Sequence, residues 1–227
     1  MSIFLDSGDL NEIQRFYKMG IIRGVTTNPT LLLKDGIKGD LDVICQHFIK
    51  IAQMINPYPL SAEVTSNDKD KMIEQARDIA KWADNMIVKI PIHGPNGELE
   101  NLEVVHELEK KHGVRINVTA MMSAQQCYLA ASAGATYVSI FGGRVNNMGY
   151  NTIGEIKILR KLLDDFDLPS KIIMGSTREI LNVVEWLHAG AHIVTVLPKF
   201  LEGMIVHPYS KETVKMFLDD AEKGKGT

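Results

Sequence analysis

The chain has 227 residues, of which 45% are apolar and 23% charged, as in ordinary soluble globular proteins with a sizeable core. Its formal net charge of −3 at pH 7 argues against a nucleic-acid-binding protein and against binding to acidic membranes. No apolar run is long enough to span a bilayer, and Asp6 and Asp9 stand where a signal peptide would be apolar.

Short apolar runs then alternate with amphipathic segments from one end of the chain to the other. Strands are predicted where β-branched and other apolar residues run together between turn residues, at 2–6, 22–27, 60–64, 86–90, 114–118, 137–141, 171–174 and 193–197. Helices are predicted where apolar residues keep helical spacing, at 10–20, 41–55, 72–80, 101–112, 123–133, 153–165, 179–188 and 199–206. Residues 91–99 and the Gly142-Gly143 pair are expected to lie in loops.

These eight strand–helix units follow one another without a linker or a low-complexity segment. Alternation of this kind predicts a parallel sheet, and eight units in a chain of this length predict a single (β/α)8 TIM barrel, an α/β domain covering residues 1–227. The alternative is an open doubly wound sheet. No Gly-x-Gly-x-x-Gly motif follows the first strand, so we favour the barrel.

An additional helix is predicted at residues 209–222, after the last strand–helix unit. Its apolar residues Val214, Phe217, Leu218 and Ala221 form one stripe. Because no barrel strand remains for this helix to cover, it either closes one end of the barrel or packs on a neighbouring subunit.

The two cysteines and the pair His188 and His192 are not predicted to form a disulfide or a metal site. Cys45 and Cys127 are the only cysteines, both in predicted helices, and are expected to be packing residues of a reducing compartment, which makes the cytoplasm the expected location. His188 and His192 have a spacing that metal ligands use, but Gly190 lies between them at the expected helix end. Zinc needs three or four ligands, so we expect no metal.

Lys89 lies inside the apolar strand Ile87-Val88-Lys89-Ile90. Burial disfavours the charged form of a lysine, which makes this position costly. One explanation is a structural lysine paired with a carboxylate, and the other is a Schiff-base lysine whose amine attacks a carbonyl. The lysine alone does not decide between the two.

Polar residues follow or end seven successive predicted strands. In a barrel the carboxyl ends of the strands form one rim, which is where active sites lie. Any one of these residues has an ordinary structural explanation, but a structural explanation for the whole set is much harder. Besides Lys89, the residues are Asp6, Asn28, Glu63, Asn117, Thr119, Ser139, Arg144, Ser176 and Arg178.

The chemistry of these side chains is complementary. A Schiff base on Lys89 would turn a ketone into an electron sink, so that a neighbouring carbon–carbon bond can break. Asp6 is placed to take the proton of the departing aldehyde, and Glu63 with Thr119 could hold the water that is lost when the imine forms. Amides such as Asn28 suit sugar hydroxyls, whereas the guanidinium groups suit an anionic tail.

In these residues the chain resembles the transaldolase family, in particular its short branch, which also contains the fructose-6-phosphate aldolases. The similarity covers nearly the whole chain. It rests on the blocks Phe4-Leu5-Asp6, Gly24-Val25-Thr26-Thr27-Asn28-Pro29-Thr30, Ser61-Ala62-Glu63-Val64-Thr65, Val88-Lys89-Ile90-Pro91, Asn117-Val118-Thr119 and Ala135-Thr136-Tyr137-Val138-Ser139.

The resemblance implies the roles of the site residues. Lys89 would form the Schiff base, Asp6 would be the acid/base at bond cleavage, and Glu63 with Thr119 would hold the catalytic water. Substrate would be bound by Thr26, Asn28, Asn117, Ser139 and Phe141, and its anionic group by Arg144, Ser176 and Arg178. The resemblance implies no metal or organic cofactor, and it implies ketose and aldose substrates and a homo-oligomer, typically a decamer, in which the C-terminal helix reaches a neighbouring subunit.

Two questions about the reaction stay open at this point. Members of the branch that transfer a dihydroxyacetone unit have Glu and Phe where the aldolases have Gln and Tyr, so Glu63 and Phe141 favour transfer over simple cleavage. Departures at residues 7–9, 92–99, 120–123 and 142–143 touch the substrate rim, which leaves open whether the anion is a phosphate or a sulfonate, as in sulfofructose-cleaving members. A barrel that only binds a sugar phosphate, without catalysis, is the non-enzyme alternative.

Overall fold

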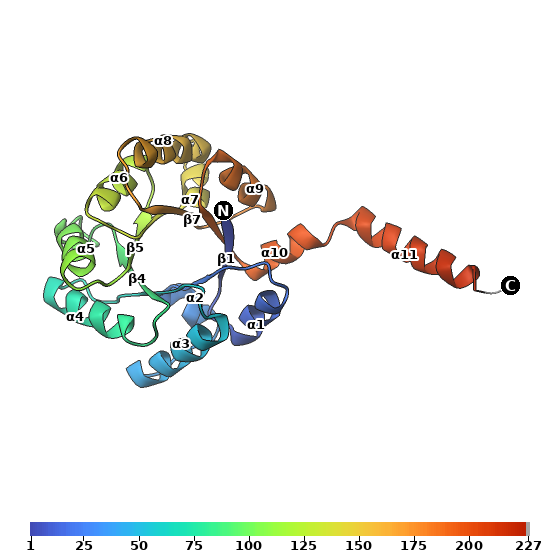
Figure 1. The fold of residues 1–227 in the computed structure, drawn as a ribbon, viewed down its shortest axis with the longest axis horizontal. Coiled ribbons are helices and arrows are strands. Elements are labelled where there is room, and N and C mark those ends of the chain that lie inside the picture. The colour runs from blue at the N-terminus through green and yellow to red at the C-terminus, as the bar shows by residue number, and fades with distance from the viewer. Residues whose placement is uncertain (226–227) are drawn as a thin grey trace.

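The computed structural model describes residues 1–225 and contains a closed barrel of eight parallel strands surrounded by helices (Figure 1). Consecutive strands pair in parallel, and β1 closes the ring by pairing with β8. The strands are β1 (Ser2–Asp6), β2 (Val25–Thr26), β3 (Leu60–Glu63), β4 (Met86–Pro91), β5 (Ile116–Met121), β6 (Tyr137–Ile140), β7 (Lys171–Met174) and β8 (Ile193–Val196). The predicted (β/α)8 barrel is confirmed, and the open sheet is excluded.

The helices begin where capping residues in the sequence allow it. The carboxylate of Asp9 accepts hydrogen bonds from the backbone N–H groups of Asn11 and Glu12 at the start of α1. Within residues 1–225 the helices are α1 (Leu10–Lys18), α2 (Pro29–Lys34), α3 (Leu41–Ile55), α4 (Lys69–Ala80), α5 (Glu100–Lys111), α6 (Ala124–Ser132), α7 (Gly142–Asn147), α8 (Thr152–Asp165), α9 (Ile180–Ala189), α10 (Pro198–Ile205) and α11 (Pro208–Lys223).

Two hydrophobic cores hold the barrel together. The larger core lies between the strands and the surrounding helices, and Trp186 and Phe16 are among its largest fully buried side chains. The smaller core contains Phe4, Ile87, Tyr137, Ile173 and Ile193, one residue from each of five strands. Because alternate strand residues share a face, Lys89 and Asp6 point the same way as Ile87 and Phe4, one layer nearer the carboxyl ends of the strands.

Two short helices lie where the sequence predicted no helix. In α2 the side-chain oxygen of Asn28 caps the helix by accepting from the N–H of Leu31 at 2.9 Å, and Pro29 occupies the first turn. In α7 the pair Gly142 and Gly143, expected to loosen a loop, begins the helix instead. Both helices are only six residues long, too short for an apolar period to show in the sequence.

Strand β5 continues beyond its predicted end at Val118. It runs to Met121, and its register with β6 shifts between Val118 and Met121. Ala120 has a φ of +60°, in the left-handed region, at this irregularity. Thr119 lies inside the strand, beside the carboxyl end of β4, where Pro91 is its register partner.

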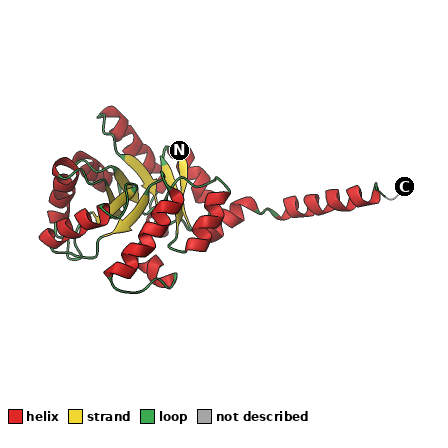
Figure 2. Cartoon of the chain, turned by 60° about the horizontal axis from the view of Figure 1, so that its bottom comes forward, coloured by secondary structure: helices red, strands yellow, loops and turns green. Residues whose placement is uncertain are grey.

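Helix α11 projects away from the barrel (Figure 2). All of its described side chains are exposed, including Val214, Phe217 and Leu218 at 56%, 62% and 63%. The helix therefore does not close an end of the barrel, which was one of the two alternatives for it. No helix within residues 1–225 is long and apolar enough to cross a membrane.

Candidate active site

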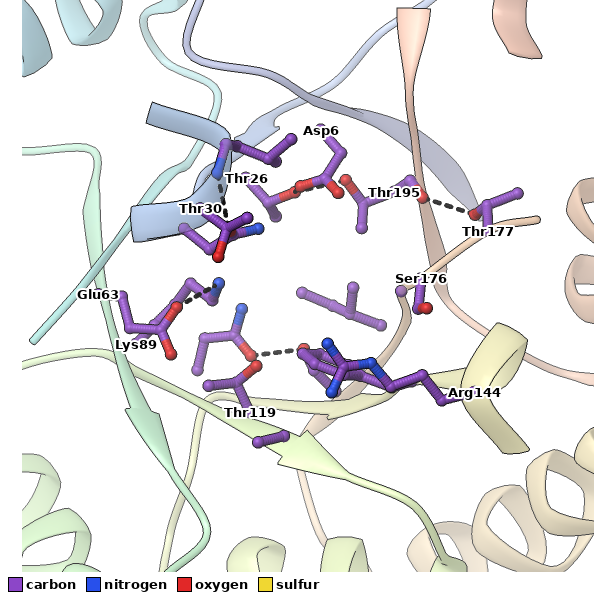
Figure 3. Close-up of a pocket in the computed structure, with 18 of the residues that line it drawn as sticks. Asp6, Thr26, Thr30, Glu63, Lys89, Thr119, Arg144, Ser176, Thr177 and Thr195 are labelled. Carbon is purple, nitrogen blue, oxygen red and sulfur yellow. Dashed lines mark hydrogen bonds and ion pairs between the residues drawn. The ribbon is translucent and has the colours of Figure 1, made fainter. Parts of the chain in front are cut away.

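A cavity of about 430 Å³ opens at the carboxyl ends of the strands (Figure 3). It is lined by every residue that the sequence predicted for the site, although these residues come from strands, loops and helix α7 around the barrel. The twelve residues are Asp6, Thr26, Asn28, Glu63, Lys89, Asn117, Thr119, Ser139, Phe141, Arg144, Ser176 and Arg178. The structure thus brings together in one place side chains that lie up to 172 positions apart in the chain.

Lys89 lines the cavity and is only 5% exposed. Its Nζ donates to the backbone carbonyl of Thr27 at 2.6 Å and to Oε2 of Glu63 at 3.0 Å. The ion pair follows from the barrel register, since Glu63 and Lys89 are partners in the β3–β4 pairing. A structural lysine would make the same ion pair, but this amine also borders a cavity where a small molecule can reach it.

Asp6, at the end of β1, is the second carboxylate of the cavity. Its Oδ1 accepts a hydrogen bond from the hydroxyl of Thr26 at 2.7 Å. Burial raises the pKa of Asp6 above its ordinary value, against the opposing effects of the Thr26 hydrogen bond and of the charge on Lys89. A carboxyl with a raised pKa exchanges a proton more readily near neutral pH, which suits a general acid/base.

Two buried polar atoms in the cavity lack a partner among residues 1–225. They are Nδ2 of Asn117 and Oγ1 of Thr119. The other end of the Asn117 amide is fixed, because its Oδ1 accepts from the hydroxyl of Ser139 at 2.6 Å. Buried donors and acceptors are costly unless they are bonded, so these two groups are placed to hold a ligand or a water molecule.

The two arginines line the cavity from neighbouring segments, since Cγ of Arg178 lies close to Gly143, the residue before Arg144. Arg144 comes from α7 and lies over the ring of Phe141, with 5.2 Å from its guanidinium carbon to the ring centroid. Arg178 and Ser176 follow β7. A Cβ on Gly143 would lie 1.8 Å from the carbonyl oxygen of Ser176, so only glycine lets α7 approach the loop after β7 this closely.

Sequence reasoning missed part of the cavity wall. The clearest omission is Thr195 in β8, which is 6% exposed and lies beside Thr26. It is the only polar residue of the strand Ile193–Val196, and a threonine in an apolar strand is an ordinary β-former. The remaining lining residues that were not predicted are Pro29, Thr30, Leu31, Ala120, Ile173, Gly175, Thr177 and Leu197.

The two histidines considered as metal ligands lie away from this site. Nδ1 of His192 accepts from the N–H of Ile172 at 3.0 Å, and its Nε2 lies 3.1 Å from the guanidinium of Arg160. His188 is exposed on α9. Within the part of the chain that the structure describes, no group of three or more metal-ligating side chains occurs.

These features define a class of protein: a (β/α)8 barrel with a lysine–carboxylate centre in a cavity at the carboxyl ends of its strands, where the active sites of barrel enzymes lie. The family model described as Transaldolase/Fructose-6-phosphate aldolase matches residues 3–226. The chain belongs to this family and is an enzyme of the transaldolase type.

Individual relatives agree with this assignment. The chain is 39% identical over 222 residues to "Probable transaldolase 2" of Listeria monocytogenes, covering 98% of this chain and 96% of the relative. It is 42% identical over 226 residues to "Probable transaldolase" of Caldicellulosiruptor saccharolyticus, covering 98% of each chain. Among solved structures, a mandelate oxidase variant has a TM-score of 0.56 at 12% identity, covering 82% of this chain and 58% of that longer one. This last similarity shows the fold alone.

Proposed function

We propose that this enzyme transfers a dihydroxyacetone unit from a ketose with an anionic tail to an aldose such as glyceraldehyde 3-phosphate, through a Schiff base on Lys89. The observation that carries the proposal is the buried amine of Lys89, which borders the cavity and lies 3.0 Å from Glu63. No metal or organic cofactor is needed for this reaction, because the imine itself accepts the electrons of the broken bond.

The first half of the reaction forms and uses the imine. Lys89 first gives a proton to Glu63, its ion-pair partner, and the neutral amine adds to the ketose carbonyl. The resulting carbinolamine then loses water, which Glu63 protonates with that proton and Thr119 holds. Asp6 then takes the proton from the hydroxyl beyond the bond to be broken. That bond breaks, the aldehyde leaves, and the electron pair moves into the imine to give an enamine on Lys89.

The second half reverses these steps on another aldehyde. The enamine carbon attacks the carbonyl of the acceptor, and Asp6 returns its proton to the new hydroxyl. The held water then hydrolyses the imine, which frees the product ketose and the amine of Lys89. We assign the sugar hydroxyls to Thr26, Asn28, Asn117 and Ser139, because their polar groups surround the same cavity.

We further propose that Arg144, Ser176 and Arg178 bind the anionic tail of the substrate. Two guanidinium groups and a hydroxyl that line the same cavity suit either a phosphate or a sulfonate, including the tail of 6-deoxy-6-sulfofructose. The choice is tested by comparing kcat/KM for a phosphorylated and a sulfonated ketose of the same length. A ratio above tenfold in either direction identifies the natural tail.

The state of assembly is part of the proposal. Helix α11 exposes Val214, Phe217 and Leu218 to solvent away from the barrel. We infer that these side chains pack on a neighbouring subunit, giving a homo-oligomer, with the decamer of the short branch as its expected form. Light scattering of the full chain and of a chain ending at Val206 tests this inference.

We assign the cytoplasm as the location, in line with two free cysteines.

Transfer itself is tested with an isotopic label. The enzyme is incubated with fructose 6-phosphate and ¹³C-labelled glyceraldehyde 3-phosphate, and transfer moves the label into the ketose without release of free dihydroxyacetone, which an aldolase would release. We expect labelling with the wild type and none with Lys89→Ala, whereas Lys81→Ala, which alters an exposed lysine, should behave as the wild type. Label incorporation by Lys89→Ala at the wild-type rate would refute the proposal.

A further inference from the structure

Thr195 lies in the cavity, but the reaction outlined above gives it no task. It belongs to β8, and Thr26 belongs to β2, so the two residues flank β1 and its terminal residue Asp6 from opposite sides. The hydroxyl oxygens of Thr195 and Thr26 are 2.5 Å apart, and that of Thr26 is 2.7 Å from Oδ1 of Asp6. Figure 3 shows the three side chains next to one another along one wall of the cavity.

The direction of this hydrogen-bonded chain follows from counting protons. Each threonine hydroxyl has one proton to donate. A carboxylate is a stronger acceptor than a hydroxyl, so the proton of Thr26 goes to Asp6. The oxygen of Thr26 then remains as an acceptor, and the short contact with Thr195 is made by the proton of Thr195. The chain therefore runs from Thr195 to Thr26 to Oδ1 of Asp6.

We propose that Thr195 is a positioning residue for Asp6: its hydroxyl fixes the Thr26 hydroxyl as a donor to Oδ1, which stabilises the carboxylate and leaves Oδ2 free to take the substrate proton. Every side-chain hydrogen bond of Asp6 within residues 1–225 is made by Oδ1. The inference rests on the proposed function, in which Asp6 is the acid/base, and it adds Thr195 to the residues that this reaction uses.

Thr195 is itself held in place by the backbone. It pairs with Phe4 in the β1–β8 register, and its carbonyl accepts from the hydroxyl of Thr177 at 2.9 Å. At 6% exposure its side chain has little room to turn. Thr195→Val keeps the shape and removes only the hydroxyl, and Thr195→Ser keeps the hydroxyl, so the pair of variants separates hydrogen bonding from packing.

Other charged groups face Asp6 and must be kept constant in the test. Lys89 on β4 lowers the pKa of Asp6, whereas Glu63 on β3 and Asp35 after α2 raise it. Asp35 is fixed independently, because its Oδ2 accepts from the N–H of Gly8 at 2.8 Å. Within residues 1–225 the hydroxyl of Thr195 bonds to Thr26 and not to any of these groups, so its loss acts on Asp6 through Thr26.

The first measurement is the pH dependence of kcat/KM for cleavage of the ketose. The acidic limb reports the ionisation of the free enzyme's base, here Asp6. Neighbouring hydrogen bonds strengthen one another by about 10–30% of the strength of a hydrogen bond to a charged group, so Thr195→Val should move the limb to higher pH by about 0.1–0.7 pH units. Thr26→Val, which removes the donor itself, should move it further, and Thr195→Ser should restore the wild-type limb. A merely structural Thr195 would lower kcat/KM equally at every pH, which would overturn the inference.

The second measurement does not depend on turnover. The carboxyl of Asp6 is titrated by NMR in protein labelled with ¹³C-aspartate, with Asp6→Asn to assign its signal. The inference predicts a higher titration midpoint in Thr195→Val than in the wild type, and equal midpoints would overturn it while leaving the proposed function intact. A fully active Asp6→Asn would instead refute the role of Asp6, and with it the proposed reaction, whatever the titration shows.

Discussion

The packing of Gly143 against the loop after β7 leads to a quantitative prediction for Gly143→Ala. A Cβ at this position would lie 1.8 Å from the carbonyl oxygen of Ser176 and 2.6 Å from Cγ of Arg178. Ordinary van der Waals contact begins at 3.4 Å, so the loop or α7 must move by about 1.6 Å to restore it. The blocking atom belongs to the backbone, and Ser176 already has a φ of +59°, so no side-chain rotation relieves the clash.

Two effects of this displacement are expected. Overpacking of a tight site costs about 1–3 kcal/mol, which in a chain of this size lowers Tm by about 2–12 °C. A misplacement of about 1 Å at a reacting centre costs on the order of 100-fold in rate. We therefore expect kcat/KM for an anionic ketose to fall about 100-fold in Gly143→Ala. Borohydride trapping of neutral dihydroxyacetone should be retained, because Lys89 lies outside the displaced loop.

The matched control is Gly154→Ala in helix α8. There a Cβ would meet only the side chain of Asn151, 3.3 Å from its Nδ2, so a shift of a few tenths of an ångström suffices and the N–H of Gly154 can keep its 3.1 Å hydrogen bond to Oδ1 of Asn151. This variant should keep wild-type kcat/KM and wild-type Tm within a few degrees. The reasoning is refuted if Gly143→Ala has the Tm of the wild type and acts on the anionic ketose within threefold of it.

Three further predictions follow from the site. Burial raises the pKa of Asp6 above its ordinary value of 3.8, because the folded protein disfavours the charged carboxylate. At pH values above 3.8 the buried charge therefore lowers the free energy of unfolding. Asp6→Asn should then be inactive but more stable than the wild type at pH 7.5. This gain in stability should disappear as the pH falls toward 3.8, and urea unfolding of both proteins at the two pH values measures it. Arg178→Ala should weaken binding of an anionic ketose about ten- to a hundredfold, the worth of one contact to a charged group, and leave dihydroxyacetone nearly unaffected; equal losses for both would mark Arg178 as structural. Phe141→Tyr introduces a hydroxyl that can protonate the enamine, so this variant should release a larger share of free dihydroxyacetone, most of all when combined with Glu63→Gln. If the wild type releases dihydroxyacetone as fast without an acceptor aldehyde as with one, the enzyme is an aldolase and not a transaldolase.

The barrel was predictable because each strand and helix carries its own signal. The predicted strand 171–174 and helix 41–55 coincide with β7 and α3, since apolar spacing is a local property of the chain. Helices α2 and α7 are six residues long and have too few positions to show a period. The end of β5 depends on its irregular pairing with β6, which is not a local property.

The position of α11 shows the same limit. The stripe of Val214, Phe217 and Leu218 predicts an amphipathic helix, and the structure confirms a helix there. An apolar stripe requires a partner but does not say which one. The sequence therefore allowed the helix to cover the barrel, whereas the structure shows it projecting from it (Figure 2).

The site was predictable to the extent that barrel geometry alone brings residues together. Parallel strands place their carboxyl ends on one rim, so Asp6, Glu63 and Lys89 had to meet once the barrel was assigned. Thr195 was missed because its importance comes from a contact with Thr26, 169 positions away. Gly143 was noticed as unusual, but its close approach to Ser176 appears only in three dimensions.

The central claim is that Lys89 forms a Schiff base with a ketose, and reductive trapping tests it most directly. The enzyme is incubated with dihydroxyacetone or fructose 6-phosphate, treated with borohydride and digested, and the peptides are analysed by mass spectrometry. We predict one reduced three-carbon adduct, on Lys89. We predict no adduct in Lys89→Ala or Lys89→Arg, and we expect both variants to fold. The arginine variant fails because a guanidinium stays protonated and cannot form an imine. An adduct on another lysine, or full turnover by either variant, would contradict the account.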